Sequence, residues 1–152
     1  MNSELELFRE NVRRFIAEEV VPNYQQWEKD EIFPRQLWNT LGVQGLLAVD
    51  LPEEYGGFGT NFLFSMVIQE EFSKANCAAV GGPMAVHSDI VSHYILNHGS
   101  EDQKQAYLPR MVSGECVGAV AMTEPGTGSD LQGLRTTAKR DGNDYIINGS
   151  KT

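Results

Sequence analysis

The chain has 152 residues, of which 41% are hydrophobic and 22% are charged, and its formal net charge is −9. This composition is typical of a soluble globular protein of one domain or slightly more, and it excludes a disordered or fibrous chain. Because a phosphate backbone would be repelled by the negative charge and no Lys/Arg stripe is present, we expect no nucleic-acid partner.

The first element in chain order is an amphipathic helix near the N-terminus. Its apolar residues recur at helical spacing: Leu5, Phe8, Val12, Phe15 and Ile16. Pro22 either interrupts this helix or begins the next one. The opening MNSELELFRE is acidic, unlike a secretory signal or an Arg-rich transit peptide, and no window holds the roughly eighteen apolar residues of a membrane span. We therefore expect a cytoplasmic protein without a membrane span.

A second helix is predicted after Pro34, which suits a first-turn position. Its apolar face contains Leu37, Trp38 and Leu41, and Gly42 is its expected end. The proline and glycines of the following GLLAVDLPEEYGGFG prevent either helical or strand periodicity from persisting. This stretch is therefore predicted to be irregular.

Helical spacing then returns in three further segments. The first begins at Asn61 and places these residues on one face: Phe64, Val67, Ile68, Glu71 and Phe72. The second is expected from Met84 to Ile95. The third follows Ser100, with Gln103 as its capping-box partner, and ends or bends around Pro109. About five helices are predicted in all, which indicates a bundle.

The periodicity changes from helical to alternating near Cys116. VGAVAM (117–122) is predicted to be a short strand, and RTTAKR (135–140) and DYIING (144–149) are strand-like segments joined by a turn at 141–143. Residues 117–152 carry four basic and four acidic groups, so the whole net charge belongs to the helical part.

The predicted fold is mainly α. An N-terminal helical domain (1–116) is followed by the first strands of an antiparallel β-domain (117–152). So few strands would leave an open sheet edge, and we therefore expect the chain to be a fragment.

The segment TEPGTGSDLQG (123–133) admits two interpretations. It lacks the GK[ST] of a P-loop and the third glycine of a dinucleotide fingerprint. It is explained by a simple connection in which Pro125 fixes a turn, Gly126 and Gly128 supply positive φ, and Asp130 forms a cap.

The same segment is also rich in hydrogen-bond donors. Its backbone amides at 126–129 and the hydroxyls of Thr123, Thr127 and Ser129 could form a concave surface for carbonyl or phosphate oxygens. Chemistry of this kind favours a ligand site.

AMTEPGTGSDLQG, followed by YIINGSKT, resembles the first signature of the acyl-CoA dehydrogenase family of flavoproteins. NHGSEDQKQAYLPRMVSGE and LPEEYGGFG are similar to that family as well, so the resemblance covers nearly the whole chain. Within that family, the residues of these motifs most resemble those of long-chain acyl-CoA dehydrogenases and their bacterial relatives. Thr127 departs from the pattern, because the family usually has Ala, Gly or Ser there, and the extra methyl and hydroxyl are expected to alter local packing.

The resemblance implies an N-terminal helical domain, a middle β-domain and a C-terminal helical bundle, with FAD between the last two. The flavin-contacting residues would be Val120, Met122, Thr123, Gly128 and Ser129. Met122 would lie against the ring system and Thr123 would bind its pyrimidine side. Ser129 would touch both the cofactor and the coenzyme A part of the substrate.

The resemblance also implies the reaction. A base removes the α-proton of an acyl-CoA while the β-hydrogen leaves as hydride to FAD, which gives the trans-2-enoyl-CoA. The base is a glutamate of the C-terminal bundle, so no catalytic residue is expected in this chain, which by itself should be inactive. Glu124 should accept backbone hydrogen bonds and lose basicity. The whole protein is expected to be a homotetramer of fatty acid β-oxidation that passes electrons to an electron-transfer flavoprotein.

Two other functions stay open: a flavin oxidase relative that reduces oxygen, and a self-contained helical interaction module. No metal site is expected, because the spacing of His87, His93 and His98 favours helix-surface or helix-end positions. Cys77 and Cys116 are expected to be buried thiols of a reducing compartment, with a disulfide between them as the alternative.

Overall fold

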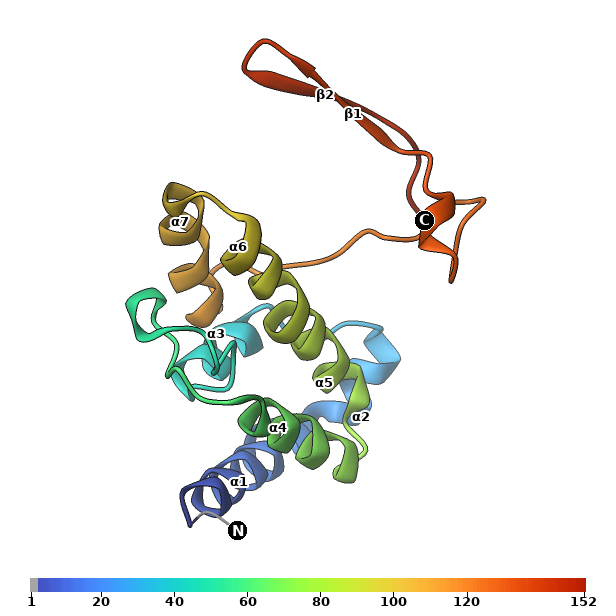
Figure 1. Ribbon diagram of the computed structural model, residues 1–152. Coiled ribbons are helices and arrows are strands. Elements are labelled where there is room, and N and C mark those ends of the chain that lie inside the picture. The colour runs from blue at the N-terminus through green and yellow to red at the C-terminus, as the bar shows by residue number, and fades with distance from the viewer. Residues whose placement is uncertain (1–2) are drawn as a thin grey trace. The chain divides into compact units, whose positions relative to one another are not determined.

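The computed structural model describes residues 3–152 (Figure 1) and consists of two compact units with a boundary between Ala119 and Val120. The first unit contains α1 (Ser3–Phe15), η1 (Ile16–Val20), α2 (Val21–Asp30), α3 (Gln36–Val43), η2 (Glu53–Tyr55), α4 (Phe62–Lys74), α5 (Ala78–Ala85), η3 (Val86–Val91), α6 (Ser92–His98) and α7 (Glu101–Val112). The second unit contains η4 (Leu131–Gly133), β1 (Thr137–Asp141) and β2 (Asp144–Asn148). The prediction of a mainly α fold with antiparallel strands is confirmed.

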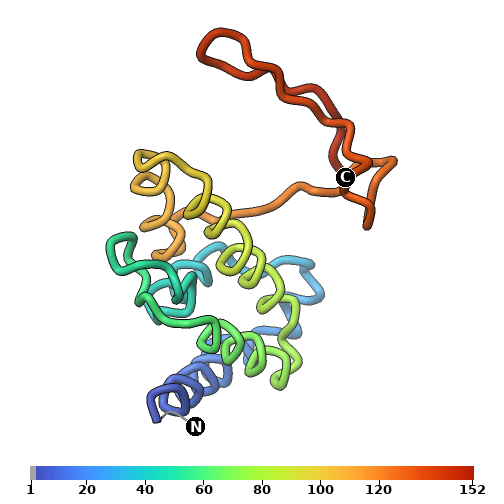
Figure 2. Tube along the Cα trace, in the orientation of Figure 1, coloured from blue at the N-terminus to red at the C-terminus, as the bar shows by residue number. Residues whose placement is uncertain are grey.

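Two long helical rods each consist of two α-helices joined by a π turn, without a break between them. The trace runs without a break through α1, η1 and α2, and again through α5, η3 and α6 (Figure 2). The helical segments of residues 3–152 therefore make five rods, as the sequence predicts: these two and α3, α4 and α7.

A proline accompanies each π turn. The N–H of Val21 donates to the carbonyl of Ile16, five residues back, directly before Pro22. Pro83 lies inside α5, just before the second π turn begins at Val86. Proline lacks an N–H and crowds the carbonyl four residues earlier, which for Pro22 lies inside η1, so the widened turn there lets the helix continue past Pro22. Pro22 therefore marks the start of α2 without ending the rod.

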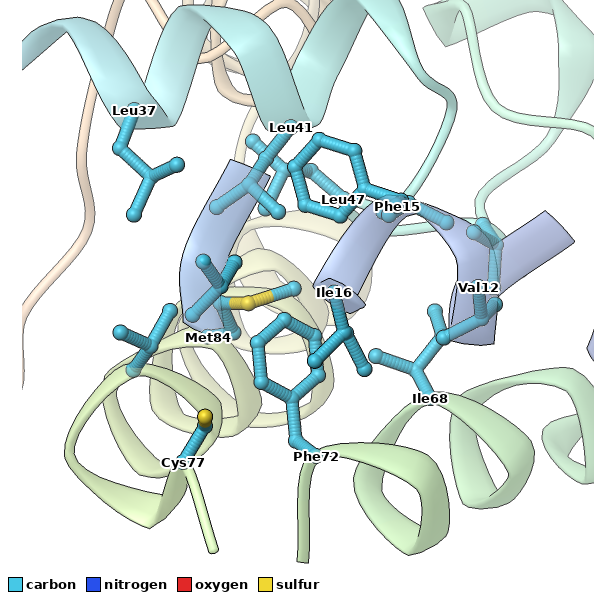
Figure 3. Close-up of a cluster of buried hydrophobic side chains, with 14 of the residues drawn as sticks. Val12, Phe15, Ile16, Leu37, Leu41, Leu47, Ile68, Phe72, Cys77 and Met84 are labelled. Carbon is cyan, nitrogen blue, oxygen red and sulfur yellow. The ribbon is translucent and has the colours of Figure 1, made fainter. Parts of the chain in front are cut away.

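The main core of the helical unit lies where α1, α3, α4 and α5 meet (Figure 3). Its fully buried members include Val12, Leu41, Phe72 and Met84. Burial of each such side chain contributes about 2 kcal/mol through the hydrophobic effect. A second buried cluster joins the irregular stretch after α3 to α7 and contains Leu51, Leu108 and Met111, among other residues.

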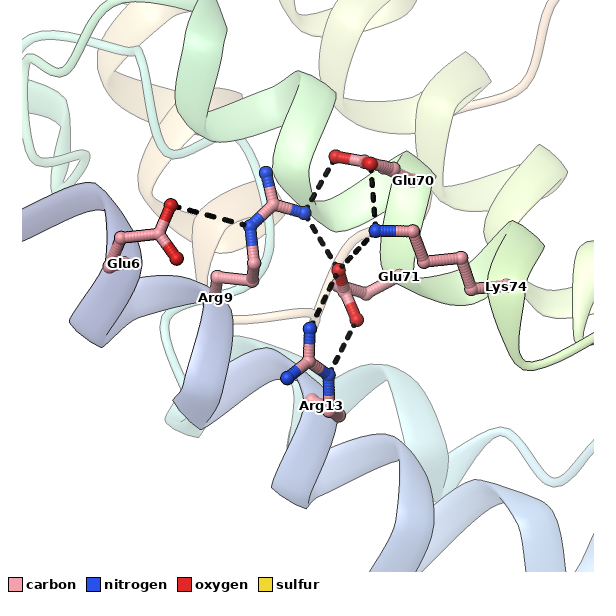
Figure 4. Close-up of polar contacts among 6 residues, drawn as sticks. All are labelled: Glu6, Arg9, Arg13, Glu70, Glu71 and Lys74. Carbon is pink, nitrogen blue, oxygen red and sulfur yellow. Dashed lines mark hydrogen bonds and ion pairs between the residues drawn. The ribbon is translucent and has the colours of Figure 1, made fainter. Parts of the chain in front are cut away.

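One carboxylate is buried between α1 and α4 (Figure 4). The Glu71 side chain is 2% exposed, and its oxygens accept hydrogen bonds from Arg9 (2.7 Å), Arg13 (2.9 Å) and Lys74 (3.2 Å). Burial by itself raises the pKa of Glu71, but the hydrogen bonds from Arg13, Arg9 and Lys74 lower it to about 2. Glu71 therefore stays ionised and ties the two helices together.

Two predicted helix boundaries are wrong, and a third is close. The helix expected from Met84 begins at Ala78, because α5 accommodates Pro83 in its interior. The helix after Ser100, expected to end or bend around Pro109, includes this proline and ends three residues later, at Val112. The other error is at Gly42, which lies inside α3; the left-handed residue after this helix is Gly45, with φ +66°. A Cβ on Gly42 would collide with the Ser113 carbonyl, so this glycine serves close packing against the end of α7.

The second unit is built on a hairpin. β1 and β2 pair antiparallel, with Thr137 opposite Asn148 and Asp141 opposite Asp144, so the two-residue loop is Gly142–Asn143. Gly142 has φ +62°, which a glycine adopts readily. The predicted hairpin turn is thus confirmed, and every residue of both strands is exposed.

The strand predicted at 117–122 is absent from the part of the chain that the structure describes. A strand needs a hydrogen-bonded neighbour, and the hairpin strands pair only with each other. Side chains bind this backbone at two points: the Gly118 N–H donates to His87, and the Met122 carbonyl accepts from Lys151.

Candidate functional site

The segment 123–129 begins with a tight turn. The N–H of Glu124 donates to the carbonyl of Thr127 at 3.0 Å, and the N–H of Thr127 donates back to the carbonyl of Glu124 at 3.0 Å. Pro125 and Gly126 occupy the two central positions, where the fixed φ of proline favours a bend. These reciprocal bonds hold the turn without a left-handed residue.

The Glu124 carboxylate is the polar centre of this unit. It is 7% exposed and accepts hydrogen bonds from the N–H groups of Arg135 (2.7 Å) and Thr136 (3.0 Å), and the Lys151 ammonium lies 3.0 Å from it. The Thr136 side chain, the Arg135 N–H and the Lys151 ammonium lower the pKa of Glu124 to about 2. The prediction that Glu124 accepts backbone hydrogen bonds and loses basicity is confirmed.

The segment YIINGSKT returns to this turn. Lys151 also donates to the Met122 carbonyl at 3.2 Å, and the N–H of Thr152 donates to the Thr123 carbonyl at 3.0 Å. A Cβ on Gly149 would collide with the Thr136 side chain, so only glycine allows this close return. The two sequence motifs that carry the family resemblance are thus one structural site.

Most of the predicted flavin-contacting residues are exposed, and we call the exposed residues of 122–129 the open face. Thr123, Gly128 and Ser129 are exposed, Met122 is 41% exposed, and Val120 is half-buried. The side chain of Met122 offers an apolar contact, and the hydroxyls of Thr123 and Ser129 offer donors.

The positive φ expected at Gly126 and Gly128 is wrong, because the reciprocal bonds of the turn already provide the bend. A Cβ on either glycine would meet no atom within 4 Å. These glycines therefore keep the backbone accessible to an approaching ligand. The predicted cap is confirmed, since the Asp130 side chain accepts from the N–H of Gln132 at 3.2 Å.

Thr127, the departure from the family pattern, is 8% exposed. Its Oγ1 would lie 2.9 Å from a Cβ on Gly133, so the extra methyl and hydroxyl fill space inside the loop beside that glycine.

The histidines occupy three different environments. His87 is fully buried, so the expected helix-surface or helix-end position is wrong for it; its ring is held by hydrogen bonds in the core. His93 is partly exposed and lies 2.9 Å from Asp50, and His98 is exposed at the end of α6. Within residues 3–152, no group of three or more His, Cys, Asp and Glu side chains is arranged to hold a metal ion.

Cys77 is buried and Cys116 partly buried, and both are free thiols. None of the described helices is both long enough and apolar enough to cross a membrane.

Lys151 is the site residue that sequence reasoning missed. Its only signal is its place two residues after the Asn148–Gly149 pair, at the end of the motif YIINGSKT. The sequence around Lys151 does not show which carboxylate this lysine binds; the fold brings it to Glu124.

Comparison with known proteins supports the assignment of both units. Residues 2–115 match the family described as "Acyl-CoA dehydrogenase, N-terminal domain", and residues 119–152 match "Acyl-CoA dehydrogenase, middle domain". The long-chain specific acyl-CoA dehydrogenase of Sus scrofa mitochondria is 49% identical over 150 residues, which are 99% of this chain and 34% of that protein. The chain thus spans about a third of the length of this relative.

Solved structures show the same fold. The acyl-CoA dehydrogenase of Geobacillus kaustophilus matches with a TM-score of 0.93 and 45% identity, over 100% of this chain and 40% of that one. A glutaryl-CoA dehydrogenase of Mycobacterium smegmatis, solved in complex with FADH2, matches with a TM-score of 0.94 and 31% identity, over 99% of this chain and 39% of that one.

Proposed function

Because the chain belongs to the acyl-CoA dehydrogenase family, we propose that it supplies the N-terminal helical domain (1–116) and the start of the middle β-domain (117–152) of a flavin-dependent acyl-CoA dehydrogenase. The observation that carries the proposal is the open face of residues 122–129, built around the ionised Glu124. This face joins the two motifs that carry the resemblance.

The proposed cofactor is FAD, and the residues of the face fit it. Met122 presents an apolar side chain to a flat ring, and the Thr123 hydroxyl can bond the polar edge of that ring. Gly128 leaves the backbone open, and Ser129 offers a hydroxyl toward the cofactor and the coenzyme A portion of the substrate. The relative solved with FADH2 supports this choice of cofactor.

The proposed reaction converts an acyl-CoA thioester to the trans-2-enoyl-CoA. When bound, FAD supplies the acceptor for the β-hydrogen. Glu124 does not serve as the base for the α-proton, because a carboxylate with a pKa of about 2 and several bound donors is a weak base. Its role is to hold the loop that presents Met122 and Ser129. The family resemblance implies that the base is a glutamate of the C-terminal bundle, and we therefore propose that this chain by itself is inactive.

Fatty acyl-CoA is the proposed substrate class, since the long-chain specific enzyme of Sus scrofa is among the relatives. Fatty acid β-oxidation, an electron-transfer flavoprotein as the electron acceptor and a homotetrameric assembly are proposals that rest on the family resemblance. The cytoplasmic location stays a prediction from the acidic N-terminal sequence.

The test is to load the whole protein that contains this chain with FAD and to add palmitoyl-CoA without oxygen. We expect the visible absorption of oxidised flavin to be lost, because the substrate reduces it. Electron-transfer flavoprotein should then restore the absorption much faster than oxygen does. Fast restoration by oxygen alone would identify the oxidase alternative, and an unchanged spectrum with palmitoyl-CoA and with short or branched acyl-CoAs would refute the function.

A further inference from the structure

The buried His87 lies outside the loop around Glu124 and links three parts of the helical unit. It belongs to the π turn η3, and its ring meets Trp38 of α3 edge-on, with 5.1 Å between the ring centroids. Its Nε2 lies 3.1 Å from the Met111 carbonyl near the end of α7, and its Nδ1 lies 2.9 Å from the N–H of Gly118. Thus one side chain joins two helices to the segment that leaves the helical unit.

The two hydrogen bonds define the protonation state of the ring. A backbone N–H can only donate, so Nδ1 must accept from Gly118 and cannot carry a hydrogen. A carbonyl can only accept, so Nε2 must carry the hydrogen that Met111 receives. His87 is therefore neutral, with its hydrogen on Nε2. Burial lowers the pKa of His87, and although the hydrogen bond to Met111 raises it, the net shift is downward, which agrees with this state.

The segment that His87 holds is closely packed. A Cβ on Gly118 would lie 2.7 Å from Cγ1 of Val91 and 2.9 Å from Cε of Met111, so the backbone passes in contact with α7 and the end of η3. Two residues earlier, the N–H of Cys116 donates to the Arg110 carbonyl at 2.9 Å. After Gly118, the chain enters 119–122 without any helical or strand bond of its own.

We propose that His87 is a positioning residue, whose neutral ring fixes the path by which the chain leaves the helical unit at Gly118, four residues before Met122. The bond from Gly118 to Nδ1 holds the exit segment, and the bond from Nε2 to Met111 holds the ring. This proposal stands on contacts within the helical unit and does not depend on what the loop binds.

Two variants separate the two bonds. In asparagine, Oδ1 is separated from Cβ by the same number of bonds as Nδ1 is in histidine. In glutamine, the amide nitrogen is separated from Cβ by the same number of bonds as Nε2 is in histidine. His87→Asn therefore keeps an acceptor for Gly118 and loses the bond to Met111, whereas His87→Gln keeps a donor for Met111 and loses the acceptor for Gly118. Each variant loses one buried hydrogen bond, so both should be destabilised to a similar extent.

The measurement is hydrogen exchange of the Gly118 amide in the 152-residue chain, with the Leu41 amide in the core as the reference for global opening. We expect Gly118 protection, relative to Leu41, to fall roughly tenfold in His87→Gln and to stay near the wild-type value in His87→Asn. In the wild type, the protection of Gly118, corrected for the intrinsic exchange rate, should fall when the pH is lowered far enough to protonate His87, because a protonated Nδ1 cannot accept. His87→Asn should show no such fall.

Three outcomes would overturn the proposal. The first is unchanged relative protection of Gly118 in His87→Gln, and the second is an equal relative loss in both variants. The third is wild-type protection that does not depend on pH beyond the intrinsic exchange rate. If either variant is too unstable to measure, the pH dependence of the wild-type chain decides by itself.

Discussion

The Lys151 ammonium lies 3.0 Å from the Glu124 carboxylate and also donates to the Met122 carbonyl, so one side chain near the end of the chain supports both the anchor and the backbone of the loop. Next to these contacts, the hydrogen bond from the Thr152 N–H to the Thr123 carbonyl joins the same two segments. The geometry of the open face therefore depends on residues 27 to 29 positions away in sequence.

The first prediction concerns the anchor itself. Glu124→Gln should loosen the loop, because a neutral amide accepts more weakly than a carboxylate and no longer attracts Lys151. We expect the amides of Arg135 and Thr136 to exchange several-fold faster with solvent hydrogen. Glu53→Gln, at an exposed glutamate of η2, is the matched control and should leave both rates unchanged. If the amides of Arg135 and Thr136 exchange at the same rates in Glu124→Gln as in Glu53→Gln, Glu124 does not hold the loop.

The second prediction concerns flavin binding by the 152-residue chain. Ligand sites bury most of a bound molecule, whereas Met122, Thr123 and Ser129 lie on an open face. We therefore expect little or no flavin absorbance after the chain is incubated with excess FAD and desalted. A stoichiometric yellow complex would show that the loop holds the cofactor unaided.

The third prediction separates ligand contact from folding at Ser129. Ser129→Ala in the whole protein should reduce FAD content or raise the KM for acyl-CoA, because it removes an exposed hydroxyl from the face. The melting temperature should stay the same, since the side chain has no packing role. Ser73→Ala on the exposed side of α4 is the control. Wild-type FAD content and KM would remove Ser129 from the proposed site.

The fourth prediction concerns the buried carboxylate between α1 and α4. Glu71→Gln should destabilise the helical unit by about 2 kcal/mol, because Arg9 and Arg13 lose a buried charged partner. The cost is limited because Arg9 still pairs with Glu70, and Arg13 and Lys74 can turn to solvent. Glu70→Gln removes a charge that is 47% exposed and should cost less than about 1 kcal/mol. Urea midpoints for the two variants give the comparison, and equal shifts would contradict the assigned role.

The pH dependence of stability gives a second readout of Glu71. Its pKa in the folded chain is about 2, below the unfolded value near 4.5, so the unfolded chain binds more protons between these values. The contribution of Glu71 is therefore complete above about pH 5 and is lost as the pH falls toward 2. In Glu71→Gln this contribution is missing, so the slope of the unfolding free energy against pH should be smaller in that window.

The fifth prediction compares two glycines inside helices. Gly42→Ala should cost about 2 kcal/mol or more, because its Cβ would meet the Ser113 carbonyl and force α3 away from α7. Gly82→Ala in α5 meets no atom within 4 Å and should be neutral or stabilising by up to about 1 kcal/mol, since alanine favours the helix. Thermal unfolding of both variants tests the difference, and a Gly42→Ala variant as stable as wild type would be incompatible with this packing.

The sequence predicts the helices well where local spacing decides the structure. The face that begins at Phe64 included Glu71 among apolar residues, and this residue is indeed buried. The same spacing could not show that Arg9 and Arg13 surround the carboxylate, because those contacts span about 60 residues. Nor could it show the π turns, since they shift the helical phase without ending the helix.

The candidate site was predictable in part. Turn chemistry indicated the bend at Pro125, and the carboxylate in a donor-rich segment indicated an anchored Glu124. The prediction of a strand at 117–122 was wrong, because alternation of apolar residues shows a preference for extended structure but cannot supply a partner strand. The role of Lys151 emerged only from the return of the hairpin.

The π turn at Val86–Val91 has a consequence for how the chain tolerates changes of length. One extra residue in a turn rotates the remainder of the rod by about 100° relative to a regular α-helix. This rod can therefore direct His87 toward α7 and His93 toward Asp50 from different sides. Deleting a single residue there would restore a regular helix and leave the later side chains of α6 facing the same neighbours, so this turn accepts a one-residue deletion more readily than a regular helical turn does.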